Sequence, residues 1–270
     1  MSLPNMTSSD VAKGGSVQPP GTTLDEFLGG RIRVLQPERG HRAGSDAVFL
    51  AAAVAAVEGD RVLDAGAGVG VAGLCLLARV PGIDMTAVEI DQKLCGLAAA
   101  NAARNDFGAR FCVIAADVTG RAETLLAAGL RREGYDEVMA NPPFYREGAV
   151  RAAANAAREA AHVMREGALA AWVRFFATMA APKGRLTLIH RSEALAELLP
   201  LIEGRFGAVT LYPLFAKAGG PATRVILRAR KGSREGLTLL PGLVLHEADG
   251  RYTAEAEAVL RGGKALELGG

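Results

Sequence analysis

Four consecutive residues, Asn141, Pro142, Pro143 and Phe144, are the segment whose residue types point most directly to chemistry. An exocyclic amine conjugated to a ring is a poor nucleophile, because its lone pair is delocalised into the ring. The Asn141 side-chain oxygen and the Pro142 carbonyl can each accept one N–H bond of such an amine and so hold its lone pair toward an incoming methyl group. Pro142 and Pro143 each restrict their own backbone φ angle, which makes this segment rigid. Phe144 can stack on the flat ring.

A glycine-rich segment upstream predicts a ligand-binding turn between a strand and a helix. Gly66, Gly68 and Gly70 allow the backbone to turn tightly and to approach a ligand at the start of the helix. A dinucleotide fingerprint, G-x-G-x-x-G, would place its third glycine at position 71, where this chain has Val71. Asp64 lies two residues before the first glycine. The pattern therefore differs from that of a pyrophosphate-binding loop.

Acidic residues close the next two predicted strands. Glu89 ends the second strand, where its carboxylate can accept the ribose hydroxyls of a nucleoside, and Asp117 ends the third, where it can bind an adenine amine. Carboxylates at three successive strand ends suit a cationic nucleoside such as S-adenosylmethionine and do not suit a pyrophosphate. Methyl transfer would then be an in-line displacement that depends on positioning and desolvation.

These residues require a sheet that brings strand ends together. Short β-branched or apolar runs alternate with Ala- and Leu-rich helical stretches from Arg61 onward, which predicts a doubly wound, mostly parallel α/β sheet. A loop with Pro213, Gly219 and Gly220 joins the last two strands and predicts an antiparallel C-terminal hairpin. The predicted strands are Arg61–Ala65, Asp84–Ile90, Arg110–Ala116, Asp136–Ala140, Arg185–His190, Val209–Tyr212 and Arg224–Arg230, and the clearest helices are Val71–Arg79, Gln92–Asn105 and Ser192–Glu203.

The chain length of 270 residues suits one large α/β domain. We expect residues 1–22 to form a flexible tail and residues 23–270 a single domain. Within it, residues 23–57 form an N-terminal flap with a helix that Ser45 and Asp46 cap and that runs through Ala56. Residues 58–231 form the core sheet and residues 232–270 a C-terminal extension.

Composition limits the possible partners and compartments. A net charge of +2 excludes a polycation that would coat any nucleic acid or anionic membrane. Cys75, Cys95 and Cys112 have no metal-binding spacing and are predicted to be buried thiols of a reducing cytosol, and the four histidines are scattered, so no metal is expected. The longest uncharged apolar run is too short for a bilayer, and the first 21 residues lack a targeting pattern. A cytoplasmic protein is therefore predicted.

The glycine loop and the Asn-Pro-Pro-Phe segment together resemble those of class I methyltransferases that act on amino groups. Specifically, the chain resembles the bacterial tRNA1(Val) adenine N6-methyltransferase family, with a Rossmann-like fold. The resemblance covers nearly the whole chain. It includes the segment from Gly40-His41-Arg42 through Asp46 to Leu50-Ala51, Pro221 to Val225, and the tail from Leu243 to Leu260.

This resemblance implies an enzyme that uses S-adenosylmethionine to methylate N6 of an adenine in a tRNA, with neither metal nor membrane. It implies cofactor contacts at Arg42, Asp46, Asp64, Gly66, Glu89, Asp117 and Asn141, to which the loop itself adds Gly68 and Gly70. The order Phe144-Tyr145 is reversed in some relatives, so either ring is a candidate for stacking on the base. Arg146 is a candidate for contacting the RNA backbone.

Three other functions are compatible with parts of the sequence. A glutamine N5-methyltransferase faces the same lone-pair problem, but such enzymes typically have Asn-Pro-Pro-Tyr and a separate helical N-terminal domain. A guanine N2-methyltransferase of ribosomal RNA usually has His where this chain has Tyr145. An RNA-binding module without activity would not need the intact glycine loop, Glu89 and Asn141.

Overall fold

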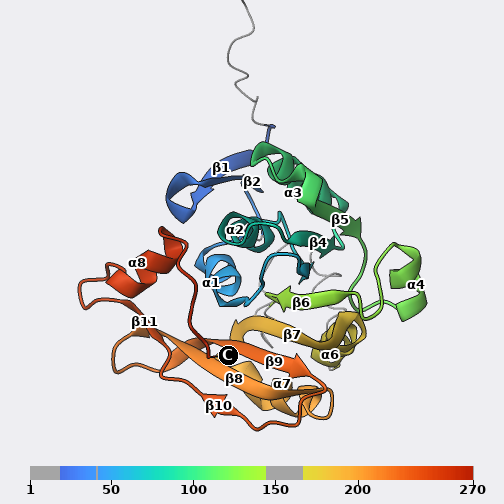
Figure 1. The fold of residues 1–270 in the computed structure, drawn as a ribbon. Helices are drawn as coiled ribbons and strands as arrows, with labels where there is room; N and C mark the ends of the chain where they lie inside the picture. The colour runs from blue at the N-terminus through green and yellow to red at the C-terminus, as the bar shows by residue number, and fades with distance from the viewer. Residues whose placement is uncertain (1–18, 41, 144–166, 270) are drawn as a thin grey trace, which may run out of the picture.

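Nine strands form the main sheet of the protein, and its centre is parallel. The computed structural model describes residues 19–40, 42–143 and 167–269. The parallel strands are β3 (Arg61–Ala65), β4 (Asp84–Glu89), β5 (Phe111–Ala115), β6 (Tyr135–Ala140) and β7 (Ala180–Arg191) (Figure 1). In β3, residues 62–65 are all buried, because a parallel strand is covered on both faces. This is why its sequence is a continuous apolar run interrupted only by Asp64.

The strand order reverses in the middle of this sheet. From β3 the chain moves outward through β4 to β5, and it then returns to the other side of β3 to form β6 and β7. Ligands bind doubly wound sheets at the carboxyl ends of the strands, where the order reverses. In this fold the order reverses between the ends of β3 and β6.

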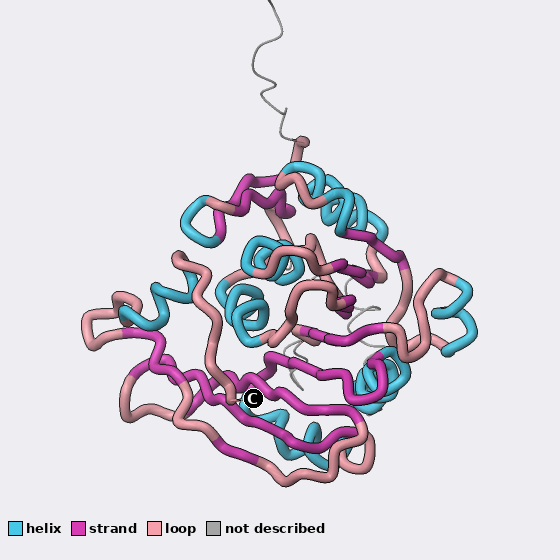
Figure 2. The backbone as a smooth tube through the Cα atoms, viewed as in Figure 1, coloured by secondary structure: helices cyan, strands magenta, loops and turns pink. Residues whose placement is uncertain are grey.

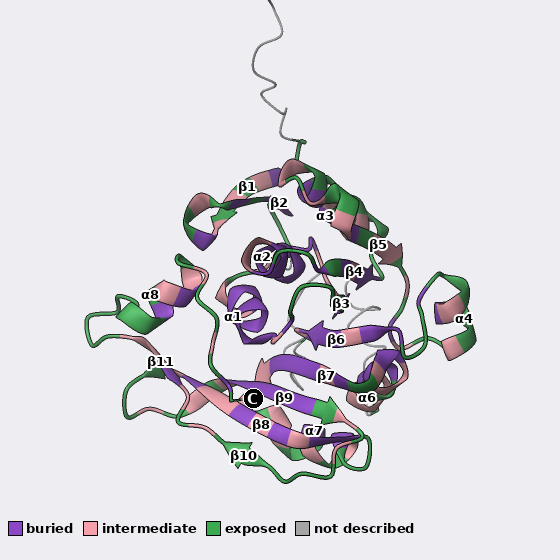
Figure 3. Ribbon diagram, viewed as in Figure 1, coloured by how far each residue is buried: buried purple, intermediate pink, exposed green. Residues whose placement is uncertain are grey.

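Helices cover both faces of the sheet, as Figure 2 shows. One apolar layer contains residues of α1 (Ser45–Ala53) and α2 (Val71–Arg79), together with the inner face of α3 (Gln92–Arg104). The other contains residues of α4 (Ala122–Ala127), α6 (Ala168–Met179) and α7 (Leu195–Ile202). Buried positions concentrate in the strands between these layers (Figure 3). The predicted doubly wound α/β sheet is confirmed.

The C-terminal part of the sheet is mixed, as predicted. β8 (Phe206–Lys217) and β9 (Ala222–Lys231) form an antiparallel hairpin, and β9 lies between β7 and β8. Both strands are longer than the sequence suggested. Two short strands in the C-terminal extension, β10 (Thr238–Leu239) and β11 (Leu243–His246), pair in parallel with β8, and α8 (Ala254–Leu260) follows them. The extension therefore widens the same sheet.

The N-terminal flap is a separate two-stranded hairpin. β1 (Thr22–Phe27) and β2 (Ile32–Pro37) pair along their whole length, and the short 3-10 turn η1 (Leu28–Gly30) joins them. Gly29 and Gly30 both have positive φ, which the turn requires. Two further 3-10 turns, η2 (Gly108–Arg110) and η3 (Ser192–Ala194), precede β5 and α7.

The helix predicted after the flap is shorter than expected and has a different cap. Gly44 is the N-cap residue and no side chain caps the helix, so the prediction that Ser45 and Asp46 cap it is wrong. The helix ends at Ala53 because Val54 has extended backbone angles. Arg79, in the last turn of α2, donates to the carbonyls of Ala51 and Val54 and thereby satisfies the end of α1.

The three thiols differ in burial. Cys75 in α2 is buried, Cys95 in α3 is half-buried and Cys112 in β5 is exposed. The prediction that all three are buried is wrong for Cys95 and Cys112. β5 is an edge strand with a neighbour on one side only, so an apolar segment there is less covered than one at the centre.

Candidate functional site

The carboxyl ends of three central strands place the predicted site residues side by side. The last register pairs join the end of β3 to Val88 of β4 and to Ala140 of β6. The residues that follow, Gly66, Glu89 and Asn141, are therefore neighbours at one edge of the sheet. This edge is also where the strand order reverses. Segments separated by many residues in the sequence thus meet at one site, as predicted.

The glycine loop has the backbone conformation that its sequence suggests. Gly66, Gly68 and Gly70 all have positive φ, at 67°, 58° and 88°. At Gly66 the close approach of Trp172 is a second constraint, because an added Cβ would lie 2.7 Å from the Trp172 ring. At Gly68 an added Cβ would meet nothing within 4 Å. Trp172 thus packs against the loop at Gly66, whereas the space next to Gly68 is open.

Glu89 fixes the loop to the end of β4. Its Oε2 accepts the Gly68 N–H at 2.8 Å, and its Oε1 accepts the N–H groups of Ile90 and Asp91 at 2.8 and 3.0 Å. A carboxylate has about four acceptor positions, so Oε2 keeps capacity for a further donor. Glu89 therefore both shapes the glycine loop and can accept a hydroxyl from a ligand lying against it.

Asp64 is a buried carboxylic acid under the same loop. It is 2% exposed and its Oδ2 has no hydrogen-bond partner among the described residues. Burial raises the pKa of Asp64 to about 7, a backbone hydrogen bond from Gly73 opposes the rise, and the nearby charge of Glu89 adds to it. A buried carboxyl oxygen without a partner is costly unless one is supplied. A cationic ligand would supply one.

Asp117 lies beyond the end of β5, two residues after Ala115, the residue that pairs with Glu89. It is exposed, and its Oδ1 accepts the N–H and the hydroxyl of Thr119 at 2.8 and 2.7 Å. These bonds fix the side chain in a turn and leave Oδ2 for a ligand. Of the three acidic residues predicted to end neighbouring strands, Glu89 ends β4, but Asp64 is the last residue but one of β3, and the prediction that Asp117 ends its strand is wrong because β5 stops at Ala115.

Asn141 follows the last residue of β6 and is half-buried, while Pro142 is buried and Pro143 is exposed. The Asn141 side-chain oxygen is buried and has no hydrogen-bond partner in the described structure. A carboxamide oxygen in this state is an acceptor for an N–H donor that the described chain does not provide. The other predicted substrate residues, Phe144, Tyr145 and Arg146, lie outside the described residues.

The two flap residues predicted to contact the cofactor are engaged in ion pairs. Arg42 donates to Asp25 and to Thr23 of β1, and to the carbonyl of Pro37. Asp46 accepts from Arg224 of β9 at 2.9 Å. Arg42 therefore joins the hairpin to the segment before α1, and Asp46 joins the start of α1 to the sheet. Their cofactor roles stay predictions.

One residue at this edge was not identified from the sequence. Ile90, next to Glu89, is 66% exposed although it is a large apolar side chain. An exposed isoleucine at the carboxyl edge of a parallel sheet is a candidate for contact with the flat apolar face of a ligand. The only sequence signal is its place directly after an acidic strand end. Trp172, which packs under the glycine loop, is a core residue at 4% exposure.

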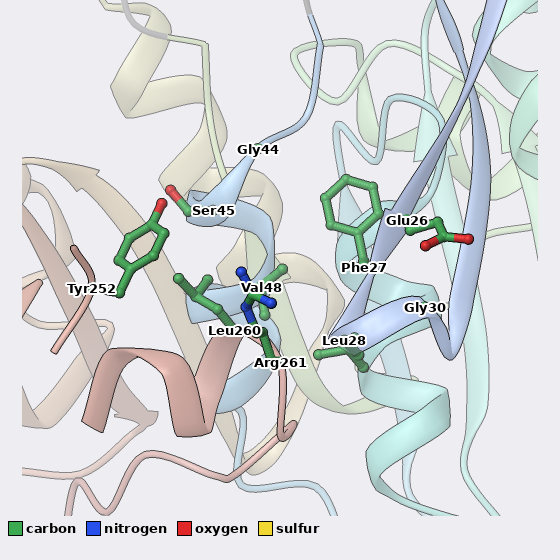
Figure 4. A pocket seen from close by; sticks show the side chains of 11 residues that line it. Glu26, Phe27, Leu28, Gly30, Gly44, Ser45, Val48, Tyr252, Leu260 and Arg261 are labelled. Carbon is green, nitrogen blue, oxygen red and sulfur yellow. The ribbon is translucent and has the colours of Figure 1, made fainter. Parts of the chain in front are cut away.

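A groove lies elsewhere in the described structure. It has a volume of about 480 Å³ and lies between the hairpin, the start of α1 and the C-terminal segment, with Phe27, Ser45, Tyr252 and Arg261 around it (Figure 4). None of the predicted cofactor residues lines it. The hairpin forms one wall, so the position of the hairpin determines the shape of this groove.

Residues 19–40, 42–143 and 167–269 contain no group of three or more His, Cys, Asp or Glu side chains that could hold a metal ion. The helices of the same residues include none with the length and hydropathy needed to span a bilayer.

Comparisons with known proteins agree with this geometry. Residues 43–209 match the family described as the methyltransferase small domain. The tRNA1(Val) (adenine(37)-N6)-methyltransferase of Aeromonas hydrophila is 30% identical over 216 residues, which cover 78% of this chain and 85% of the relative. The protein of the same name from Dickeya chrysanthemi is 27% identical over 82% of this chain and 86% of the relative.

A solved structure shares both the fold and the sequence. A predicted O-methyltransferase, protein Atu636 from Agrobacterium tumefaciens, superposes with a TM-score of 0.69 at 30% identity. The match covers 82% of this chain and 97% of the other. The mixed sheet, with its antiparallel C-terminal strands, is therefore that of class I methyltransferases.

Proposed function

Because the chain belongs to the methyltransferase small domain family, whose members use S-adenosylmethionine, we propose that it methylates the N6 amine of adenine 37 in a tRNA. The observation that carries the proposal is the buried side-chain oxygen of Asn141 beside the glycine loop, for which the described residues provide no hydrogen-bond partner. The curated relatives, which are named for this reaction, support the same substrate. A tRNA substrate would place the activity in the cytoplasm.

The described residues fit the proposed cofactor. S-adenosylmethionine supplies an electrophilic methyl group on a sulfonium and carries an ammonium, a ribose and an adenine. The Asp64 carboxyl, whose Oδ2 has no partner among the described residues, suits the positive charge. Glu89 has an acceptor position for a ribose hydroxyl, and the exposed Ile90 offers an apolar surface for the adenine. Asp117 follows β5, the strand that pairs with β4, and its Oδ2 can accept from the adenine amine.

Asn141 has the proposed role of orienting the substrate amine. Its side-chain oxygen would accept one N–H, and the Pro142 carbonyl the other, so the nitrogen lone pair faces the methyl group. Removing the amine from water into this partly buried edge strengthens both bonds. No side chain needs to form a covalent bond, and the proton that the amine loses passes to solvent.

An adenine in an RNA loop suits such a site because its base is already unpaired. The energetic cost of bringing it to the sheet edge is then low. The other acceptors to distinguish are a guanine N2 amine, a protein glutamine, and a hydroxyl group, the last because the structural relative from Agrobacterium tumefaciens is titled a predicted O-methyltransferase. Each would leave a different methylated product.

The decisive experiment is methylation of a defined tRNA. The purified protein would be incubated with labelled S-adenosylmethionine and two unmodified transcripts of tRNA1(Val), one with adenine and one with guanine at position 37. We expect N6-methyladenosine in the first transcript and no label in the second. Nucleoside analysis by mass spectrometry measures the product.

Total RNA, total protein and small-molecule extracts serve as competing acceptors in parallel reactions. Label that appears only in guanosine, in glutamine or in a hydroxyl group would overturn the proposed substrate and leave the methyltransferase assignment intact. Absence of S-adenosylmethionine binding by calorimetry would contradict the proposed cofactor site as well.

Replacement of Ile90 by serine tests the proposed adenine contact. Burying part of an isoleucine against an apolar face is worth about 1 kcal/mol, so we expect the affinity for S-adenosylmethionine to fall about fivefold. Since Ile90 is exposed, thermal stability should not change. Isothermal titration calorimetry measures the affinity.

Leu239 on β10 provides the matched control, because it is also 66% exposed and is not among the site residues. The variant Leu239→Ser should bind the cofactor like the unaltered protein. Equal losses in the two variants would mean that Ile90 acts through general surface properties and not through contact.

A further inference from the structure

A buried asparagine joins the hairpin to the glycine loop. Asn101, on α3, has an exposure of 0%. Its side-chain oxygen accepts the Leu35 N–H of β2 at 2.7 Å, and its amide nitrogen donates to the Leu35 carbonyl at 3.0 Å. The second N–H of the same amide donates to the Val69 carbonyl at 3.1 Å. Both N–H groups of one carboxamide are thus used, one on each segment.

The Asn101 carboxamide makes the two hydrogen bonds to β2 that a neighbouring strand would otherwise make. A carboxamide that accepts from the N–H of one residue and donates to its carbonyl satisfies the edge as a neighbouring strand would. Asn105 repeats the arrangement one turn later, with the Arg33 N–H at 2.9 Å and the Arg33 carbonyl at 2.8 Å. Four residues along a helix advance about 6.0 Å and two along a strand about 6.6 Å, so the two spacings match.

Only one of the two asparagines reaches the glycine loop. Asn105 gives its remaining N–H to the carbonyl of Asn101 within the same helix, at 2.7 Å. Asn101 instead reaches Val69, which lies between Gly68 and Gly70 and is 5% exposed. The pair therefore allows a comparison, because both asparagines bind the hairpin and only Asn101 also binds the loop.

We infer that Asn101 is a positioning residue for cofactor binding, whose carboxamide holds the glycine loop and the hairpin in one fixed arrangement. The inference depends on the proposed role of the glycine loop in holding S-adenosylmethionine. Without the carboxamide, the Val69 carbonyl loses its donor inside the core and the loop gains freedom that the ligand must then remove. Because the hairpin forms a wall of the groove in Figure 4, ordering of the loop is transmitted to that wall.

The first test compares Asn101→Ala with Asn105→Ala. Both variants lose two bonds to β2, but Asn101→Ala should lose more thermal stability than Asn105→Ala, because the Asn101 bonds are buried and include the bond to Val69, whereas the Asn105 bonds to β2 are exposed. We expect the dissociation constant of S-adenosylmethionine to rise about tenfold in Asn101→Ala and less than about twofold in Asn105→Ala. The turnover number at saturating cofactor should stay near that of the unaltered enzyme in both. Equal effects of the two substitutions on cofactor affinity would overturn the inference.

The second test uses the unaltered protein, so it holds even where Asn101→Ala does not fold. Amide hydrogen exchange by nuclear magnetic resonance would be measured with and without S-adenosylhomocysteine. We expect the ligand to slow exchange of the Leu35 N–H at least threefold, although β2 contributes none of the proposed cofactor contacts. Unchanged exchange at Leu35, with slowed exchange in the glycine loop, would show that the two segments are not linked.

A third variant separates this inference from the proposed cofactor site. Glu89→Ala removes the carboxylate that fixes Gly68 and should abolish detectable binding of S-adenosylmethionine. Normal binding by Glu89→Ala would refute the cofactor site itself. Loss of binding by Glu89→Ala, together with normal binding by Asn101→Ala, would refute the positioning role alone.

Discussion

Replacement of Asn141 by alanine is expected to lower the rate of methyl transfer by about 10² to 10³-fold while cofactor affinity changes less than about threefold. Losing one preorganised hydrogen-bond partner at a reacting group typically costs this much. The side-chain oxygen is buried and has no partner within residues 19–40, 42–143 and 167–269, so it contributes little to the folding of that part and can accept from the substrate amine. Single-turnover methylation of the adenine-37 transcript measures the rate, and calorimetry measures cofactor binding.

Two further variants define what the loss means. Asn141→Asp keeps the acceptor oxygen and tests whether an acceptor alone is enough. Asn105→Ala removes a carboxamide from the same protein at a position that supports β2, and should turn over near the normal rate. A rate for Asn141→Ala within tenfold of normal would remove Asn141 from the proposed role and would leave the Pro142 carbonyl as the remaining acceptor at this edge.

The sequence predicted the centre of the fold well because burial there leaves a clear pattern. β3 and α2 have the predicted bounds: a continuous apolar run marks a strand covered on both faces, and the glycine loop marks where the helix begins. Glu89 and Asn141 were found for a related reason. Each ends such a run, and the ends of parallel strands meet at one edge.

Interactions between distant segments were not predictable in the same way. Asn101 is flanked by alanines in α3, and its partner Leu35 is 66 residues away in the sequence. The pairing of Asp46 with Arg224 spans 178 residues. The strands β10 and β11 are short and form because the edge of β8 is open to pairing. Their own residues therefore show little of the apolar–polar alternation that predicts a strand. In each case the partner, and not the local pattern, determines the structure.

The affinity for S-adenosylmethionine is expected to rise with pH because of Asp64. In the free protein, burial raises the pKa of this carboxyl from 3.8 to about 7. The protonated form is therefore favoured by folding, and the contribution of Asp64 to folding stability falls as pH rises from about 4 to 7. A cationic cofactor favours the ionised form, so binding lowers the pKa and releases a proton. The dissociation constant at pH 6 should be about tenfold higher than at pH 8.

Asp64→Asn gives this expectation its control. Asparagine has nearly the same shape but does not titrate, so the ratio of the two proteins' dissociation constants isolates Asp64 from every other titrating group, including those of the cofactor. We expect the variant to bind more weakly at pH 8 and to lose the tenfold change between pH 6 and pH 8. Calorimetry at pH 6 in buffers of different ionisation enthalpy should show release of close to one proton by the unaltered protein and none by the variant. If both proteins showed the same pH dependence, Asp64 would not be the group that meets the cofactor's charge, and Glu89, which shares the loop, would become the candidate.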